Sequence, residues 1–195
     1  MDAINILLAI NLFVTFAANI GGARKGIKTS ILAVKERPKT FLQKLPPNIT
    51  VVTLLLIIFS IFQTGTLDYK TFAFMYPARI TGLCVYIAFS WLQIWAYKTL
   101  GGNFAQDIVI LKNHNLVTTG PYKYIRHPQY LGQLLADTGA SLALLSFTAL
   151  PVVLLLEIPL IIMRAREEER LLQKHFREIF ISYKKGTGFI LPFHG

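Results

Sequence analysis

Residues 48–64 read NITVVTLLLIIFSIFQT, a stretch without a single charged residue, and this stretch sets the class of the protein. A helix rises about 1.5 Å per residue and the hydrocarbon core of a bilayer is about 30 Å thick. An uncharged apolar run of this length therefore predicts a membrane-spanning helix. Pro46 and Pro47 come directly before it, where proline suits the first turn of a helix.

Four further apolar runs bring the expected number of membrane-spanning helices to about five. They cover residues 3–20, 76–97, 129–147 and 148–163. Trp91 and Trp95 lie near the end of one run, as is typical of the aromatic belt at a membrane interface. The last run is short and contains two prolines, so we expect it to form a tight hairpin with the run before it.

The composition of the whole chain agrees with an integral membrane protein and argues against other classes. Of 195 residues, 53% are hydrophobic and only 15% are charged, whereas soluble domains are about 25% charged. A mean hydropathy of +0.49 excludes a soluble nucleic-acid-binding domain, in spite of the net charge of +10, and also a disordered chain. Cys84 is the sole cysteine, and the four histidines lack metal-ligand spacing, so we expect neither a disulfide nor a metal site.

The basic residues predict how the helices are oriented. Of the 20 Lys and Arg residues, all but Lys70 and Arg79 fall between the first and second runs, between the third and fourth, or after the fifth. Basic loops favour the cytoplasmic side of a membrane, and five crossings place all three basic segments on one side. We therefore expect the N-terminus outside, and residues 99–128 and the C-terminal tail in the cytoplasm.

The chain divides into an N-terminal half of three membrane helices, residues 1–98, and a second half, residues 99–195, that carries the chemistry-bearing motifs. In the second half, IVILKNHNLV at residues 108–117 predicts an extended piece or a short hairpin. His127 and Pro128 stand at the start of the fourth run, where proline suits the first helical turn. We expect the His127 side chain to face whatever binds at the mouth of that helix.

The tail from residue 164 to residue 185 has apolar residues at helical spacing, which predicts a C-terminal amphipathic helix lying on the membrane surface. Arg164 and Glu168 lie one helical turn apart at the end of the fifth run, where an ionisable cluster indicates a functional site. An ordinary ion pair would give the same spacing. Asp137 and Glu157 lie inside the last two runs, and we expect them to bond to neighbouring helices or to line a cavity.

Two motifs taken together resemble a known family. GPYKYIRHPQYLG at residues 120–132, followed by REEERLL at residues 166–172, resembles the isoprenylcysteine carboxyl methyltransferases and their phospholipid methyltransferase relatives, in their minimal prokaryotic form. The similar part runs from about residue 103 to residue 192. The resemblance implies an all-α integral membrane enzyme that uses S-adenosylmethionine, releases S-adenosylhomocysteine and has no Rossmann domain. The sequence agrees, because it contains no G-x-G-x-x-G motif.

The resemblance also implies the position of the site. Its substrate-binding arginine falls on Arg164, and Arg126 is a second candidate for holding a substrate carboxylate through charge-assisted hydrogen bonds. A carboxylate is already ionised at neutral pH, so such a site aligns it without a general base. The residues implied to bind the cofactor are Ile110, His114, Asn115, Leu116, Val117, Tyr122, His127, Pro128, Gln129, Tyr130 and Glu168. The substrate is implied to be lipophilic and to enter from the bilayer.

Three functions remain open on this basis. Arg164 favours methylation of the carboxylate of a prenylated cysteine or a similar isoprenoid acid. Phospholipid N-methylation is a second function, which the acidic residues 167–169 support. A sterol-reductase-like enzyme that uses NADPH is a third, although no motif in the sequence marks a site for its 2′-phosphate.

Overall fold

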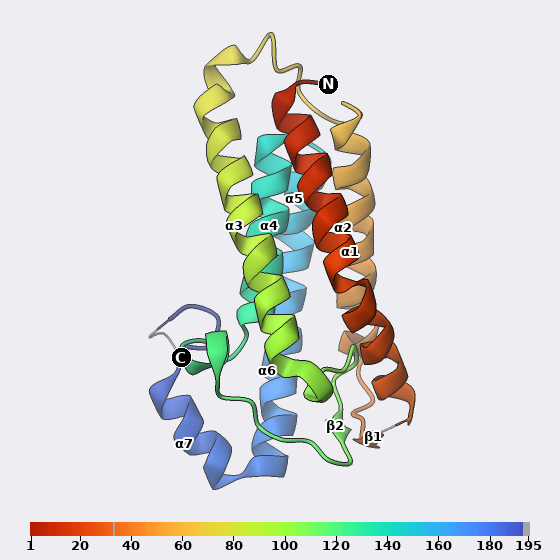
Figure 1. Cartoon of the computed structure of the whole chain (residues 1–195), viewed down its shortest axis with the longest axis vertical. Coiled ribbons are helices and arrows are strands. Elements are labelled where there is room, and N and C mark those ends of the chain that lie inside the picture. The colour runs from red at the N-terminus through yellow and green to blue at the C-terminus, as the bar shows by residue number, and fades with distance from the viewer. Residues whose placement is uncertain (33, 193–195) are drawn as a thin grey trace.

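Helices make up most of the chain and stand side by side as one bundle (Figure 1). The structure, a computed structural model, describes residues 1–32 and 34–192, and only the backbone course of residues 21–32. The helices are α1 (Ala3–Leu32), α2 (Leu45–Ile61), α3 (Tyr76–Leu100), α4 (Pro128–Ala143), α5 (Ala149–Val152), α6 (Ile158–Phe176) and α7 (Glu178–Gly186). The strands are β1 (Val34–Glu36) and β2 (Ile110–Leu111). Short 3-10 turns lie at Phe41–Gln43, Ala73–Met75, Gly101–Asn103 and Gly120–Lys123.

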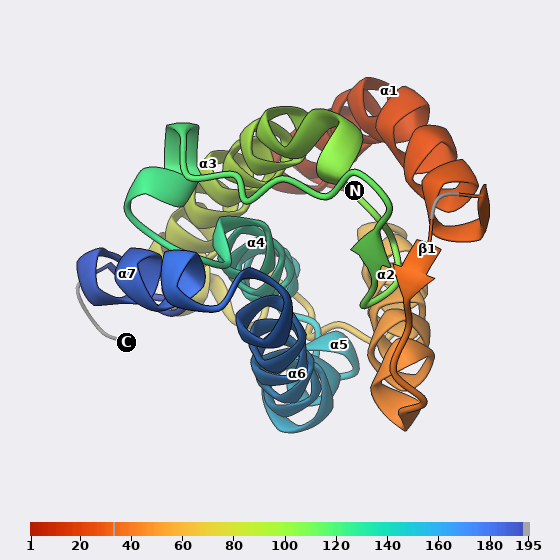
Figure 2. The same ribbon diagram turned by 90° about the horizontal axis from the view of Figure 1, so that it is seen from below.

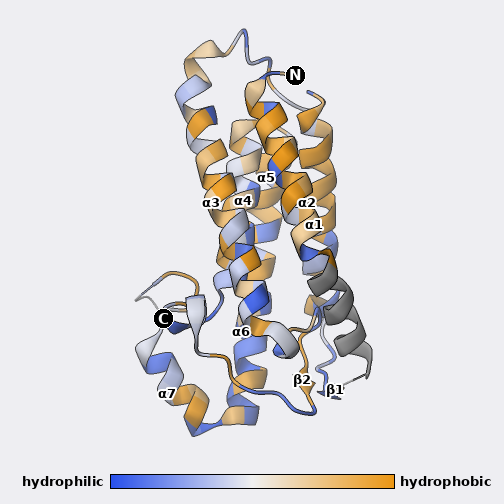
Figure 3. Cartoon of the chain, in the orientation of Figure 1, coloured by the Kyte–Doolittle hydropathy of each residue, from blue (hydrophilic) through white to orange (hydrophobic). Residues whose placement is uncertain are grey.

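Three helical stretches within the described residues are long and apolar enough to cross a membrane. They are Ala3–Ile20, Phe41–Ile61 and Ala73–Asn103. Figure 3 shows apolar residues along these helices and hydrophilic residues gathered at the end of the bundle where β1, β2 and α7 lie. These stretches coincide with the first three apolar runs and confirm a helical integral membrane protein. With 16 residues, α4 is shorter than a typical span of about 20.

The two helices in closest contact, α3 and α4, pack backbone against backbone at a pair of glycines. A Cβ atom on Gly139 would lie 2.7 Å from the carbonyl oxygen of Gly82, and one on Gly82 would lie 2.7 Å from the carbonyl oxygen of Gly139. Small residues let membrane helices approach so closely, and the gain is in van der Waals contact. Figure 2, which looks along the bundle, shows α4 between α3 and α6, so this contact places the central helix.

A buried arginine fastens the end of the bundle that carries the N-terminus. The Arg79 guanidinium, 3% exposed, donates hydrogen bonds to the Asp2 carboxylate, to Asn5 Oδ1 at 3.2 Å and to the carbonyl of Ala143 at 2.8 Å. Its face also lies 5.1 Å from the ring centre of Tyr69. These bonds join α1, α3 and the last turn of α4, and they satisfy a carbonyl that the helix end leaves without a partner.

The last long helical path contains a widened turn. It runs from α5 through a π-helical segment, Val153–Glu157, directly into α6. Pro159 has no N–H to donate to the carbonyl four residues earlier, and its ring would clash with that carbonyl, so a wider turn before it relieves the conflict. The path forms the expected hairpin with α4 through residues 144–148, where Leu145 has a φ of +52°.

The segment expected to be a hairpin of its own pairs instead with a distant part of the chain. Residues 110–111 form β2, which is antiparallel to β1 from the connection between the first two spans. The prediction of an extended piece was right, but the prediction of a turn that pairs the segment with itself was wrong. The reason is that Ile110 is fully buried against Leu42 and Leu171, and pairing with β1 holds it there.

The C-terminal tail is likewise not one helix. It breaks at Arg177, whose φ of +48° lies in the left-handed region, and the chain turns back as α7. The reversal lets Phe180, 1% exposed, pack inward while Ile179 stays exposed. One continuous amphipathic helix over residues 164–185 is therefore incorrect, because helical spacing predicts which residues share a face and not where a helix ends.

The glycine contact gives a prediction of stability. Gly139→Leu forces α3 and α4 apart at a backbone contact, and overpacking of this kind costs about 2 to 3 kcal/mol. For a chain of this size we expect the midpoint of thermal unfolding in detergent to fall by about 5 to 10 °C. Gly186→Ala is the control, since its added Cβ would meet no atom within 4 Å. Equal midpoints for the two variants would contradict the packing argument.

Candidate functional site

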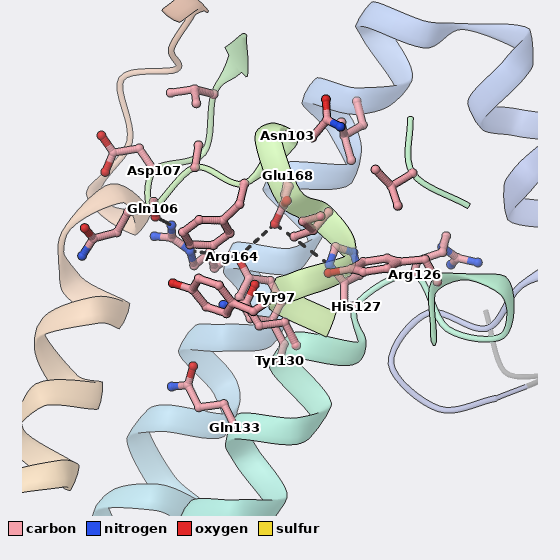
Figure 4. A pocket seen from close by; sticks show the side chains of 18 of the residues that line it. Tyr97, Asn103, Gln106, Asp107, Arg126, His127, Tyr130, Gln133, Arg164 and Glu168 are labelled. Carbon is pink, nitrogen blue, oxygen red and sulfur yellow. Dashed lines mark hydrogen bonds and ion pairs between the residues drawn. The ribbon is translucent and has the colours of Figure 1, made fainter. Parts of the chain in front are cut away.

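A cavity of about 390 Å³ opens at the end of the bundle opposite the N-terminus (Figure 4). Its walls come from α2, α3, α4, α6 and α7 and from the segment that joins α3 to α4. Both halves of the chain therefore contribute to it. Ligand cavities of about 300 to 1,000 Å³ with a few converging polar groups are typical of binding sites for small molecules.

All but two of the expected site residues line this cavity. The lining includes Arg126, Arg164 and Glu168 together with His114, Asn115, Leu116, Val117, Tyr122, His127, Gln129 and Tyr130. Ile110 lies outside the lining, because its side chain is buried against Leu42 and Leu171, while the neighbouring Val109 lines the cavity. Pro128 is also outside the lining, since it is packed in the first turn of α4.

Tyr130 bridges Arg164 and Glu168, the two residues that helical spacing places on one face of their helix. Its hydroxyl donates to Glu168 Oε2 at 2.9 Å and accepts from Arg164 Nε at 3.1 Å. Figure 4 shows the three side chains converging from α4 and α6. Arg164 and Glu168 therefore do not form the direct ion pair that their spacing suggested, because the Tyr130 hydroxyl lies between them. The carboxylate of Glu168 faces the cavity.

Arg164 uses most of its hydrogen-bond donors on the backbone. It donates to the carbonyl oxygens of Leu42 at 2.7 Å, Gln43 at 3.4 Å and Gln106 at 2.5 Å. With the bond to Tyr130, four of the roughly five N–H groups of a guanidinium are occupied. A two-pronged grip on a substrate carboxylate therefore does not fit this geometry. Arg164 instead fastens α6 to the turn before α2 and to the loop after α3.

Arg126 lines the cavity, but its guanidinium is engaged by the C-terminal part of the chain. Its guanidinium is paired with Glu169, and it donates to the carbonyl oxygens of Thr187 and of Lys184, the latter at 3.3 Å. Its face lies 5.8 Å from the ring centre of Phe189. These partners all belong to the C-terminal part of the chain, so the geometry favours Arg126 as the residue that holds this part beside α4.

Glu169 is the centre of this second cluster, and the sequence did not single it out. Besides Arg126, it is met by Lys184 Nζ at 3.1 Å and by His127 Nε2 at 3.5 Å. Burial opposes its ionisation, but His127, Arg126 and Lys184 outweigh that effect and lower the pKa of Glu169 to about 2. One carboxylate thus connects α6 with the start of α4 and the end of α7.

His127 is held at the cavity by rings as well as by charge. Its ring is stacked on Tyr130, with the centres 5.5 Å apart and the planes 10° from parallel, and it meets the edge of Phe189 at 5.2 Å. Its Nδ1 lies 4.0 Å from Glu168 Oε2. His127 lines the cavity at the start of α4, and its Nε2 lies beside Glu169.

The segment from His114 to Val117 forms another wall of the cavity. His114 Nδ1 accepts the N–H of Leu111 at 3.3 Å, and burial lowers the pKa of His114, which keeps this nitrogen free to accept. The N–H of Asn115 donates to Asn103 Oδ1 at 2.9 Å. These bonds give the segment a fixed shape along the cavity.

The C-terminal helix closes the remaining side. Tyr183 donates its hydroxyl to the carbonyl of Tyr122 at 2.6 Å, and burial raises the pKa of Tyr183 to about 12 and that of Tyr122 also above its usual value, so both phenols stay protonated. The backbone N–H groups of Arg126 and His127 donate to the carbonyls of Gly188 and Phe189 at 2.9 and 3.1 Å. Helix α7 is therefore part of the cavity wall, and residues 188–189 are bonded to the chain just before α4.

Sequence reasoning missed the polar residues that the membrane helices contribute to the cavity. They are Asn48 and Thr50 of α2, Gln93 of α3 and Gln133 of α4. The signal was present, because polar residues inside an apolar run face the interior of a bundle or a cavity. Glu157, which was expected to bond across helices, accepts hydrogen bonds from Thr50 and Gln133.

The fold and the cavity together define a class, namely a membrane-embedded helical protein with a polar binding cavity at one end of its bundle. The model of the isoprenylcysteine carboxyl methyltransferase (ICMT) family matches residues 80–174. The chain is similar to this family over that region, which is about half of its length.

The similarity extends to curated relatives and to a solved structure. Protein-S-isoprenylcysteine O-methyltransferase of Saccharomyces cerevisiae is 30% identical over 131 residues, which cover 65% of this chain and 55% of the relative. The protein of that name from Tribolium castaneum is 32% identical over 114 residues, 57% of this chain and 41% of the relative. The chain spans about half the length of these relatives.

The solved structure of a eukaryotic intramembrane Ras methyltransferase, ICMT, is similar with a TM-score of 0.65 and 22% sequence identity. The match covers 99% of this chain and 69% of that one. It shows that the two chains share a fold over nearly the whole of this chain, the three apolar helices of its N-terminal half included.

The bonds of Arg164 predict that it is needed for stability even without a ligand. Arg164→Lys keeps the charge but loses the planar fork that reaches three carbonyls, so we expect a loss of about 2 to 4 kcal/mol and a lower unfolding temperature in detergent. Arg166→Lys, at an exposed position two residues away, is the control. Unchanged stability of the ligand-free Arg164 variant would contradict the role given to its backbone bonds.

The low pKa of Glu169 predicts a pH dependence. The ionised form of Glu169 stabilises the fold at pH values above 4.5, the ordinary pKa of this carboxyl group. This contribution is lost as the pH falls towards about 2. We expect Glu169→Gln to be about 2 to 3 kcal/mol less stable than the unsubstituted protein at pH 6, with the difference shrinking towards pH 3. Unfolding temperatures in detergent across this range measure it. Glu178→Gln, at an exposed position of α7, should show no such trend, and a constant difference for Glu169→Gln would refute the assignment.

Proposed function

We propose that this chain is an S-adenosylmethionine-dependent methyltransferase that esterifies the carboxylate of a prenylated cysteine or of a similar isoprenoid acid. Similarity to the family supports the reaction class. The observation that carries the proposal is the position of the cavity, where the Tyr130-bridged pair of Glu168 and Arg164 lies at the end of membrane helices. A lipid-borne acid and a water-borne cofactor can both reach such a place.

The residues of the cavity fit S-adenosylmethionine. The Glu168 side chain is 36% exposed, and its Oε1 is available to accept from an ammonium or from ribose hydroxyls. The aromatic rings of Tyr97 and Phe104, 3.9 Å apart, offer flat surfaces beside the wall formed by residues 114–117. His127 Nε2 is buried and makes no hydrogen bond within the described residues, although Glu169 Oε1 lies 3.5 Å away. When bound, the cofactor supplies an activated methyl group on a sulfonium.

The chain's own residues would supply alignment. A carboxylate nucleophile is ionised at neutral pH and loses no proton when it is methylated, so the cavity needs no general base. The remaining N–H of Arg164 can hold one carboxylate oxygen and leave the other free to attack. Exact placement of two reactants in this way is worth about 7 to 11 kcal/mol of the barrier.

Lipid access follows from the wall formed by α2. Val51 lines the cavity and is also 55% exposed on the surface of an apolar helix. The cavity therefore borders the region that lipid would occupy. We infer that the lipophilic substrate enters from the bilayer, while the cofactor enters from the aqueous side.

The topology belongs to the same proposal. We infer that α4 and the path from α5 into α6 add two crossings to the three apolar spans. The basic segments and the cavity then lie at the cytoplasmic end, and the N-terminus lies outside. The crowding of hydrophilic residues at the cavity end supports this orientation (Figure 3).

Phospholipid N-methylation keeps one observation in its favour. Arg164 spends most of its donors on backbone carbonyls, while the carboxylate of Glu168 faces the cavity. An amine acceptor would be attracted to that carboxylate. Methylated ethanolamine headgroups in lipid extracts would decide for this function.

The decisive experiment for carboxyl methylation uses purified protein, methyl-labelled cofactor and S-farnesylcysteine analogues. We expect a base-labile methyl ester, measured as volatile label released by alkali. Cofactor binding without any ester would overturn the substrate assignment.

Glu168 gives a sharper prediction for the cofactor site. Glu168→Gln removes a charged acceptor, so we expect the affinity for S-adenosylhomocysteine, measured by calorimetry, to fall about tenfold. Glu167→Gln is a matched control, because Glu167 pairs with Arg170 at 3.0 Å and does not line the cavity. Equal affinities for the two variants would remove Glu168 from the site.

A further inference from the structure

The membrane side of the cavity ends in a polar residue that the proposed chemistry leaves unused. Gln133 lies three residues after Tyr130 on α4, so it faces the same way about one helical turn, or about 5 Å, deeper in the bundle. Figure 4 shows it below Tyr130 and Arg164. Burying an amide among apolar helices is costly unless its polar atoms are satisfied.

The side-chain amide of Gln133 has one orientation. Its Nε2 donates to Thr50 Oγ1 and to Glu157 Oε1, both at 2.7 Å, and Thr50 in turn donates to the same carboxyl oxygen at 3.0 Å. Both N–H groups of the amide are therefore used. A flipped amide would place its carbonyl oxygen against the carboxyl oxygen of Glu157, which is 0% exposed and cannot turn to water.

The oxygen of the Gln133 side-chain amide is the one polar atom of this side chain that these bonds leave unused. No donor within the described residues is bonded to Oε1 of Gln133, and Gln133 is part of the cavity lining. The cavity thus presents a fixed hydrogen-bond acceptor one helical turn below the place where Tyr130 joins Arg164 and Glu168. A substrate whose carboxylate lies near Arg164 would carry its next atoms past this acceptor.

We propose that Gln133 is a specificity-determining residue that accepts a hydrogen bond from an N–H donor next to the carboxylate of the substrate. The inference rests on the proposed function and narrows it. An amido acid, in which an amide N–H stands on the carbon beside the carboxylate, leaves no polar atom of the cavity unpaired. An isoprenoid acid without this donor leaves the Gln133 oxygen buried against apolar atoms, which is penalised. Glu157 and Thr50 are positioning residues, because they act only by orienting the amide.

The experiment compares two acids that share the farnesyl thioether and the carboxylate. N-acetyl-S-farnesylcysteine carries the amide, and S-farnesyl-3-thiopropionate lacks it. We expect the unsubstituted protein to prefer the amide-bearing acid by roughly five- to tenfold in kcat/KM, mainly through KM. Gln133→Met, similar in size but without a strong acceptor, should lower this ratio to about one while still methylating the thiopropionate.

The controls separate this proposal from the proposed function. Thr138→Val, a change of similar kind on α4 outside the cavity lining, should keep the ratio. Calorimetric binding of both acids in the presence of S-adenosylhomocysteine measures the preference without turnover. A preference that survives in Gln133→Met, or that the unsubstituted protein lacks, overturns the role of Gln133 and leaves carboxyl methylation standing. Failure to bind or methylate either acid overturns the proposed function, and this inference with it.

Discussion

The hydrogen bonds of one arginine, Arg164, hold together the parts of the chain on which the cavity depends. Its guanidinium reaches the turn before α2, the loop after α3 and a tyrosine of α4 from its own place on α6. A charge at the edge of a membrane must be satisfied in full, and a planar fork with several donors is suited to bond several carbonyls at once. The cavity walls are therefore fixed relative to one another by a group that is also part of the lining.

A second cluster performs the same task for the C-terminal part of the chain. Glu169 gathers Arg126, His127 and Lys184, and so α7 and the residues after it are tied to the start of α4. Glu168 and Glu169 are neighbours in sequence with different tasks. One carboxylate faces the cavity and the other faces the protein, because successive residues of a helix point about 100° apart.

How far the sequence predicts this structure depends on whether a feature is local. Apolar run length predicted the first three membrane helices, and all but two of the residues expected at the site lie in the cavity lining. The strand partner of residues 110–111, the break at Arg177 and the bonds of Arg126 were not predictable in this way. Each of them depends on which distant segment fills a space, and spacing along one helix or strand carries no such information.

The widened turn at Val153–Glu157 has a consequence for the angular phase of α6. A π-helical turn takes up an extra residue compared with an α-helical one, so everything after it is rotated by about 100° relative to an uninterrupted helix. Arg164, Glu168 and Glu169 all follow that turn. The directions of these three side chains therefore depend partly on the extra residue in the π-helical turn. That turn ends about two helical turns before Arg164. In a helix of regular pitch, the same side chains in the same order would face a different neighbour.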